Sequence, residues 1–273
     1  MSSKETIMLS QEQETLLIPL YAKATESHRA RPIFSDPKAG EILAAVAYDF
    51  SSLRVPRKTS ITLCLRATRL DAVARNFLNQ NPTGRVLHLG CGLDSRCLRI
   101  PPAEADWYDL DLPMVIDLRR KFYPEKPNYH LVASSVTAWD WIEQIPPDGR
   151  PTLVIAEGLL MYLTEADVRT LILKLQQRFP GCHVVADVYS QLTVRQISRH
   201  PSLKKTGATI RWGIDEAKAI ERWGTGIRLI EEWYFAQAEE INRLSKIHAA
   251  LFKLAGRFAA ANLAHRIIQL ELS

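Results

Sequence analysis

The sequence predicts an α/β fold built on a doubly wound, mostly parallel, seven-stranded sheet. From residue 84 onward, short runs rich in apolar and β-branched residues alternate with segments of helical periodicity, a pattern typical of βαβ units. Several runs are apolar almost throughout, as expected of parallel strands whose two faces are both covered. The strands are expected at 85–90, 105–111, 128–134, 152–158, 182–188, 227–236 and 265–272.

Helices are expected between these strands. The clearest one spans 164–179, where Thr164 and Asp167 are placed to cap the first turn and a Pro-Gly pair follows the last turn. Two shorter helices are expected at 113–122 and 138–145.

The N-terminal part of the chain lacks this alternation. Helical patterns dominate it, most clearly over 36–50 and 61–78. We therefore expect a helical N-terminal cap over 1–83 and a ligand-binding α/β domain over 84–273.

A long segment, 189–224, separates the fifth expected strand from the last two. It is rich in Arg, Lys, His and Trp, and a loop region of this length inside a compact domain is usually functional. We expect it to be an insertion on the substrate side of the domain. A single helix is expected over about 238–262, with Lys246, Lys253 and Arg257 on a solvent-exposed face.

Composition narrows the class of protein. The 273 residues are 47% hydrophobic and 24% charged, which is ordinary for a globular protein and excludes a disordered or collagen-like chain. The net charge of +5 is scattered along the sequence, so it suits anionic small molecules and does not indicate a nucleic-acid surface.

The four cysteines form no metal-binding pattern and are expected to be reduced thiols, without a metal site. With no signal peptide and no stretch near the ~20 apolar residues of a membrane span, a cytoplasmic protein is expected.

The stretch VLHLGCGLDSR, residues 86–96, points to a ligand site. Gly90 and Gly92 follow the first expected strand, where backbone without Cβ atoms can approach a ligand closely. Asp111 lies 21 residues after Gly90, at the end of the second strand, where its carboxylate can accept both hydroxyls of a ribose. Ser95 stands where a dinucleotide-binding turn has its third glycine, which disfavours NAD. The pattern therefore favours an adenosine ligand without phosphates, S-adenosyl-L-methionine.

Four sequence blocks occur in the order of one known family. They are FSDPKA at 34–39, VLHLGCGLDSRCLRI at 86–100, YDLDLP at 108–113 and LVIAEGLLMYL at 153–163. Together they resemble the motifs of the leucine carboxyl methyltransferase family, which includes bacterial carboxyl and polyketide O-methyltransferases of the tetracenomycin type. The segment HPSLKKTGATIRWGID at 200–215 resembles that bacterial branch.

The resemblance implies a class I methyltransferase with a Rossmann-like fold and S-adenosyl-L-methionine as cofactor. It also implies cofactor contacts by an N-terminal cation, an Arg before the first strand, the first-motif glycine, the second-motif acid and the fourth-strand Glu. These residues are Lys23, Arg66, Gly90, Asp111 and Glu157. Arg66 is expected to pair with the carboxylate of the cofactor. Where the family often has Asp and an apolar residue for the adenine amino group, this chain has Ser135 and Val136.

Further residues are candidates for the substrate side. Tyr162 is a candidate catalytic residue facing the substrate, with a core tyrosine as the alternative. Arg199, Arg211 and Trp212, in the insertion, are candidates to bind the substrate, with ordinary surface placement as the alternative.

Three polar residues near the glycine turn are assigned structural roles. His88 is expected to be a hydrogen-bonded core histidine, and Asp94 to order the turn by accepting hydrogen bonds from backbone amides. Asp109 alternates with Asp111 along the strand and is expected to face away from the ligand.

These observations favour an S-adenosyl-L-methionine-dependent O-methyltransferase that acts on a carboxylate or phenol oxygen of a small molecule such as a polyketide. A carboxylate is ionised at neutral pH and needs no general base, and no catalytic His or Asp is recognisable, which favours the carboxylate. Two alternatives stay open. One is a non-catalytic S-adenosyl-L-methionine-binding protein, mildly supported by Ser135; the other is a nicotinamide-dependent oxidoreductase, disfavoured by Ser95.

Overall fold

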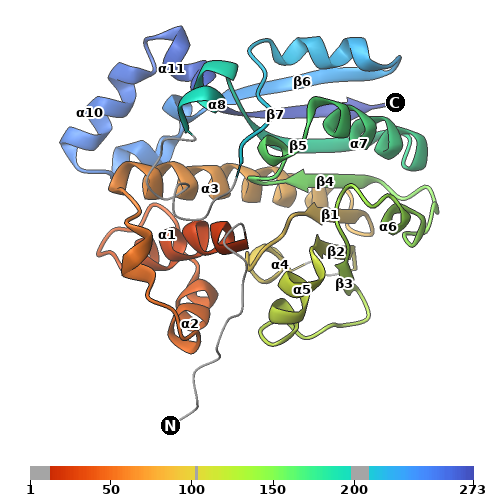
Figure 1. Cartoon of the computed structure of the whole chain (residues 1–273), viewed down its shortest axis with the longest axis horizontal. Coiled ribbons are helices and arrows are strands. Elements are labelled where there is room, and N and C mark those ends of the chain that lie inside the picture. The colour runs from red at the N-terminus through yellow and green to blue at the C-terminus, as the bar shows by residue number, and fades with distance from the viewer. Residues whose placement is uncertain (1–12, 102–103, 198–208) are drawn as a thin grey trace.

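A seven-stranded sheet forms the centre of the molecule (Figure 1). The computed structural model describes residues 13–101, 104–197 and 209–273. The strand order is β3-β2-β1-β4-β5-β7-β6, and β7 alone runs antiparallel to its neighbours. The strands are β1 (Arg85–Leu89), β2 (Asp106–Asp111), β3 (Tyr129–Ala133), β4 (Thr152–Ala156), β5 (Cys182–Tyr189), β6 (Ile227–Tyr234) and β7 (His265–Leu272). The predicted doubly wound, mostly parallel sheet is therefore confirmed, with each strand within two residues of its expected bounds.

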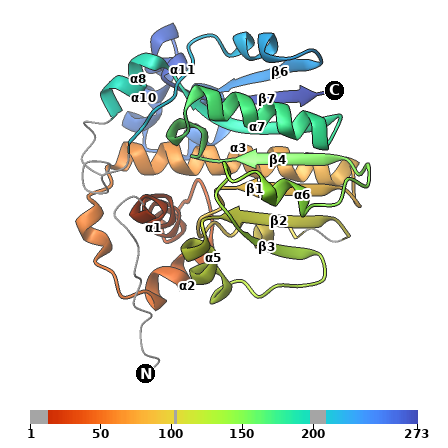
Figure 2. The same cartoon turned by 45° about the vertical axis from the view of Figure 1, so that its right-hand side comes forward.

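Helices cover both faces of this sheet (Figure 2). Alternate strand residues divide between two apolar clusters: Val86 belongs to the cluster that includes α3 (Arg57–Gln80), and Leu87 to the cluster that includes α7 (Glu165–Arg178). The first cluster also holds α4 (Arg96–Arg99) and α5 (Pro113–Arg120), and the second holds α6 (Asp140–Glu143). The apolar runs seen in the sequence are explained by this two-sided burial.

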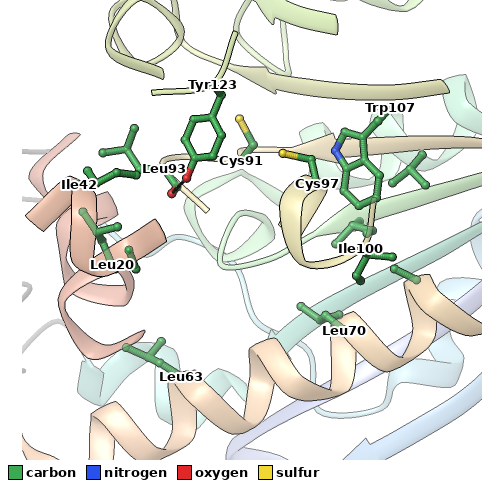
Figure 3. Close-up of a cluster of buried hydrophobic side chains, with 14 of the residues drawn as sticks. Leu20, Ile42, Leu63, Leu70, Cys91, Leu93, Cys97, Ile100, Trp107 and Tyr123 are labelled. Carbon is green, nitrogen blue, oxygen red and sulfur yellow. Dashed lines mark hydrogen bonds between the residues drawn. The ribbon is translucent and has the colours of Figure 1, made fainter. Parts of the chain in front are cut away.

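The N-terminal helices pack against the loop that follows β1. Helices α1 (Leu17–Ser27) and α2 (Pro37–Ala45) contribute Leu20 and Ile42 to the cluster that contains Leu93 (Figure 3). Tyr123 donates a hydrogen bond from its hydroxyl to the carbonyl oxygen of Leu93, at 2.8 Å. Both views show α1 and α10 (Lys246–Ala255) at the edge to which the parallel strands point (Figures 1 and 2).

The prediction of a single helix over 238–262 is wrong, because three shorter elements occupy this stretch. A 3-10 turn (Glu239–Arg243) precedes α10, whose first turn is capped by Ser245, and α11 (Ala259–Ala264) follows. Helix α10 ends at Gly256, where a side chain does not fit, because a Cβ atom would collide with the Cβ of Ala236. Lys246, Lys253 and Arg257 are exposed, as expected.

The stretch between β5 and β6 contains regular structure where a long loop was expected. Helix α8 (Gln191–Ile197) follows β5 directly, and a 3-10 helix (Ala217–Trp223) packs beside β6. The 198–208 part of this stretch lies outside the described residues. The N-terminal helices also differ in length from expectation: α2 ends at Ala45, where the chain becomes extended, and α3 already begins at Arg57.

The four cysteines are buried free thiols. Burial raises the pKa of Cys64 and of Cys182 to about 12, so both stay protonated at neutral pH. Across the ranges that the structure describes, no helix combines the length and the apolarity that a bilayer crossing requires.

Candidate functional site

A cavity of about 1400 Å³ opens where β1, β2 and β4 end. Its walls come from the loops after these strands, from α1 and α3 on one side, and from α10 and α11 on the other. In open parallel sheets ligands bind in the crevice outside the carboxyl ends of the strands, at the point where the strand order reverses. That point lies here between β1 and β4.

The glycine turn after β1 borders the cavity. Gly90 has a φ of +65° and Gly92 a φ of +51°, a conformation that favours glycine. A Cβ atom on Gly90 would lie 3.1 Å from Cδ1 of Leu159. Asp94 Oδ1 accepts a hydrogen bond from the amide of Arg96 at 2.7 Å, in agreement with its expected role of holding the turn. The side chain of Asp94 therefore helps to hold the turn in this conformation.

Asp111 lies at the end of β2 and also borders the cavity. Its Oδ2 accepts a hydrogen bond from the amide of Gly92 and its Oδ1 accepts one from the amide of Leu112, both at 2.7 Å. Burial raises the pKa of Asp111 above its ordinary value, although the two amides oppose the shift. Each carboxylate oxygen has two lone pairs, so both oxygens keep capacity for a second donor from the cavity.

A cluster of buried charges surrounds Glu157, which follows β4. Its Oε1 contacts Arg66 Nε at 3.1 Å and Lys23 Nζ at 3.3 Å, and its Oε2 contacts Arg96 Nη2 at 2.5 Å. Lys23 also forms an ion pair with Asp94. Burial raises the pKa of Glu157, but the three cations more than offset this and hold the pKa well below its usual range. Three predicted cofactor residues, Lys23, Arg66 and Glu157, therefore lie together at the cavity wall.

The sequence did not reveal that Asp187 and His265 complete this cluster. Oδ2 of Asp187 accepts a hydrogen bond from Arg66 Nη1 at 2.9 Å and lies 2.8 Å from His265 Nε2. The imidazole of His265 stacks on Tyr189, with 4.1 Å between ring centroids, and borders the cavity. Asp187 could have been predicted from the sequence, because it is an acidic residue near the end of an expected strand, as Asp111 is. No sequence pattern marks His265, which starts the last strand, 108 residues after Glu157.

Four other candidates border the cavity. Ser135 and Val136 lie on the side of Asp111, and the hydroxyl oxygens of Ser135 and Thr137 are 2.9 Å apart. Tyr162 packs against the cluster that contains Tyr189, and the amide of Arg211 donates a hydrogen bond to the carbonyl oxygen of Met161 at 2.8 Å. Burial raises the pKa of Tyr162 to about 12, so its phenol is protonated at neutral pH.

Trp212 is not brought to the cavity. Its side chain is 4% exposed and packs in the core cluster that contains α7, with its ring 6.2 Å from that of Trp223. The expectation that Trp212 binds the substrate is therefore wrong, because its indole is buried against other apolar side chains of the core. Arg199 and its neighbour His200 lie outside the described residues.

His88 and Asp109 are buried within the sheet, as expected. Nδ1 of His88 lies 3.2 Å from Oδ1 of Asp109, and its Nε2 lies 3.1 Å from Arg96 Nη1. Burial raises the pKa of Asp109, but its ion pair with Arg119 and its hydrogen bonds with His88 and Tyr129 outweigh this effect and lower the pKa to about 2.

Comparisons with known proteins agree with this geometry. The family model described as leucine carboxyl methyltransferase matches residues 17–176. The tetracenomycin polyketide synthesis O-methyltransferase TcmP of Streptomyces glaucescens is 40% identical over 230 residues, which cover 84% of this chain and 85% of that protein. The S-adenosyl-L-methionine-dependent methyltransferase dpfgK of Gibberella zeae is 30% identical, with 85% of each chain covered.

Solved structures share the fold at low sequence identity. A DUF574 family protein from Streptomyces avermitilis has a TM-score of 0.63 and 12% identity, covering 97% of this chain and 100% of that chain. A geranyl diphosphate C-methyltransferase from Streptomyces coelicolor has a TM-score of 0.51 and 13% identity, covering 94% of this chain and 98% of that chain. At these identities the likeness concerns the fold alone.

Proposed function

The chain belongs to the leucine carboxyl methyltransferase family and is an S-adenosyl-L-methionine-dependent methyltransferase, and from this premise we propose that it methylates an oxygen atom of a small apolar acceptor. The proposed acceptors are ring-bearing small molecules that carry a carboxylate or a phenol group. The name of the relative that is 40% identical, a polyketide synthesis O-methyltransferase, supports this choice. Family membership also sets aside the nicotinamide-dependent alternative.

The donor groups at one end of the cavity suit the cofactor. The methionine carboxylate would pair with Arg66, whose Nη2 has no hydrogen-bond partner among the described residues. Glu157 would face the methionine ammonium, and the spare lone pairs of Asp111 would accept the ribose hydroxyls. Ser135 and Val136 would lie beside the adenine. The glycine turn, with Gly90 held at a positive φ beside these charges, is the observation that carries the proposal.

The other end of the cavity suits an apolar acceptor. Leu251, Leu254 and Phe258 border the cavity from the α10 side while they stay 51% to 60% exposed. A bound ring system would cover this surface, which otherwise stays in contact with water. Arg211 and Tyr162 would supply polar contacts to a carboxylate or hydroxyl group.

The main contribution of the protein to the reaction would be to orient the acceptor relative to the cofactor. When bound, S-adenosyl-L-methionine supplies an electrophilic sulfonium methyl group, so the cavity must hold the acceptor oxygen in line with that methyl group, at about 3 Å. Apolar walls from α1 and α10 exclude water from the reacting atoms. A carboxylate acceptor would need no further group, whereas a phenol would react faster with its proton removed.

Asp111→Ala tests the cofactor part of the proposal. Loss of two hydrogen bonds to a charged acceptor should weaken S-adenosyl-L-homocysteine binding by about 100-fold. Asp117→Ala, on the exposed surface of α5, is the control and should bind as the wild type does. Calorimetric titration measures both affinities, and unchanged binding by Asp111→Ala would contradict the proposed site.

Tritium transfer from labelled cofactor to 1-naphthoic acid and to 1-naphthol tests the catalytic part. Transfer to either probe, with the label recovered as ester or ether, is the expected result. Binding of S-adenosyl-L-homocysteine without transfer to either probe would favour the non-catalytic binding protein.

A further inference from the structure

The guanidinium of Arg66 is held between two carboxylates. Its Nε donates a hydrogen bond to Oε1 of Glu157 at 3.1 Å, and its Nη1 donates one to Oδ2 of Asp187 at 2.9 Å. Glu157 follows β4 and Asp187 lies on β5, so two neighbouring strands bind one side chain that comes from α3. Because the guanidinium is planar, contacts at two different nitrogens fix both its position and its plane.

The third nitrogen of Arg66 remains for a ligand. Arg66 borders the cavity, and within 13–101, 104–197 and 209–273 no hydrogen bond reaches its Nη2. The Arg66 side chain is only 4% exposed, so it has already lost most of its contact with water. A side chain that is ordered in advance loses less conformational entropy when it binds a ligand, and the ligand binds more tightly.

Asp187 is itself held by three donors. Its Oδ1 accepts a hydrogen bond from the amide of Gly158 at 2.6 Å, and its Oδ2, which contacts Arg66, also lies 2.8 Å from Nε2 of His265. The imidazole of His265 is in turn stacked on Tyr189, with 9° between the ring planes. The Asp187 carboxylate therefore has a fixed orientation, set by the turn after β4 and by the first residue of β7.

The charges of these groups support the arrangement at neutral pH. Burial raises the pKa of Asp187, but Arg66 and His265 outweigh this effect and hold the pKa below its ordinary value. Burial lowers the pKa of His265 below 6.5, against the raising effect of Asp187, so the ring is neutral at pH 7.5 and donates its Nε2–H to the carboxylate. A neutral donor orients Asp187 without cancelling the negative charge that attracts Arg66.

Gly158 allows the guanidinium to lie against the turn after β4. Its φ is +64°, and a Cβ atom at this position would lie 3.2 Å from both Nη1 and Nη2 of Arg66. A residue with a side chain would therefore push the guanidinium away. The same turn thus supplies the amide that orients Asp187 and the space that Arg66 occupies.

We propose that Asp187, held by Gly158 and His265, is the positioning residue that keeps Arg66 oriented for the carboxylate of the cofactor. This inference rests on the proposed function, which places the methionine carboxylate at Arg66, and it adds the residues that set the affinity of that contact. Asp187 acts through Arg66 and does not itself bind the cofactor. Without its carboxylate, Nη1 loses its acceptor, and Arg66 must be ordered at the moment of binding.

Two ligands, compared in the wild type and in Asp187→Asn, test this role. They are S-adenosyl-L-homocysteine and its decarboxylated analogue, S-adenosyl-3-thiopropylamine, which keeps the amino group and lacks only the carboxylate. By calorimetric titration the wild type should bind S-adenosyl-L-homocysteine at least about 10-fold more tightly than the analogue. In Asp187→Asn one carboxylate oxygen becomes an NH₂ group, so Gly158 and Arg66 cannot both keep their acceptor. The variant should bind S-adenosyl-L-homocysteine about 10-fold more weakly than the wild type, and the analogue within about twofold.

Two further variants complete the comparison. Asp106→Asn removes an ion pair with Arg150 at the opposite end of β2 from Asp111, so it should bind both ligands as the wild type does. Gly158→Ala leaves every charge in place and should weaken the binding of S-adenosyl-L-homocysteine more than that of the analogue, because the new Cβ atom displaces the guanidinium. This variant also tests the inference if Asp187→Asn does not fold.

The outcomes separate the inference from the proposed function. An equal loss of affinity for both ligands in Asp187→Asn would show a general structural role and overturn the inference, and so would unchanged affinity for both. Equal affinities of the wild type for the two ligands would also overturn it, because Arg66 would then not bind the carboxylate. These three results leave cofactor binding intact, whereas a wild type that does not bind S-adenosyl-L-homocysteine would reject the inference together with the proposed cofactor site.

Discussion

Glu157 shows how a buried carboxylate can be kept charged. Three cations contact its two oxygens, and its side chain is only 5% exposed. An unpaired charge at this depth would cost several kcal/mol, so each partner is needed. The same residues would hold the methionine end of the cofactor, so the cluster serves both stability and binding in our proposal.

Glu157→Gln should therefore destabilise the protein in a pH-dependent way. At pH 7 we expect the free energy of unfolding to fall by about 3–5 kcal/mol, because three buried cations lose one of their partners. The folded-state pKa of Glu157 lies below its ordinary 4.5, so its contribution is complete above about pH 4.5 and is lost as the pH falls toward the folded pKa. Urea denaturation from pH 7 down to pH 3 should show the difference between the two proteins shrinking below pH 4.5.

Glu143→Gln is the matched control. Glu143 is 70% exposed in its ion pair with Arg178, so its substitution should cost less than about 1 kcal/mol at every pH. A difference between Glu157→Gln and the wild type that stays constant down to pH 3 would mean that the carboxylate does not titrate as described.

Part of the site could be predicted from single residues. Asp111 ends β2 and Glu157 directly follows the apolar strand β4, and residues at the carboxyl ends of parallel strands meet at one edge. Lys23, Arg66 and His265 come from helices and from an antiparallel strand, where no local pattern marks which side chain turns inward. Lys23 and Arg66 were found through the family resemblance, and His265 was missed.

At the scale of elements, α10 differs from the other long helices because it buries no residue. It was expected to be part of one longer helix over about 238–262. Ile247, Leu251 and Leu254 are exposed on α10, and Leu251 and Leu254 border the cavity. Periodicity identified a helix here but could not identify its partner, since an acceptor-binding surface and a core-facing stripe have the same sequence pattern.

Comparing Leu251→Asn with Ile247→Asn tests whether the exposed apolar face of α10 binds the acceptor. Both residues are exposed on one face of α10, one turn apart, but only Leu251 is among the described residues that border the cavity. Loss of about 1.5 kcal/mol or more of apolar burial on acceptor binding should raise the KM for 1-naphthol by about 10-fold in Leu251→Asn. Ile247→Asn should leave the KM unchanged, and both variants should bind S-adenosyl-L-homocysteine as the wild type does. Equal KM values for the two variants would argue against α10 as an acceptor wall.

At the scale of the whole molecule, the N-terminal helices and the sheet share one core. Leu20, Leu70, Trp107 and Val185 belong to a single apolar cluster, although they come from α1, α3, β2 and β5. The sequence indicated a helical cap of 1–83 beside an α/β domain of 84–273, which describes the order of elements along the chain. Alternation of strands and helices cannot reveal whether two such parts bury a common surface, because that depends on contacts between residues far apart in sequence.

We expect the two parts to unfold together, and the distribution of tryptophan offers a direct test. All six Trp residues lie within 84–273, so the tryptophan fluorescence originates in that part of the chain. Leu70→Ala, at a fully buried position of α3, should cost about 2–5 kcal/mol as a cavity-forming substitution. If α3 and the sheet unfold as one unit, the urea transition followed by fluorescence shifts by this full amount and coincides with the transition followed by circular dichroism. Asn76→Ala, on the exposed face of α3, should shift neither transition. A fluorescence transition unmoved by Leu70→Ala would show that the cap folds independently, and the ion pairs that join Lys23 and Arg66 to Glu157 would then bridge two separately stable parts.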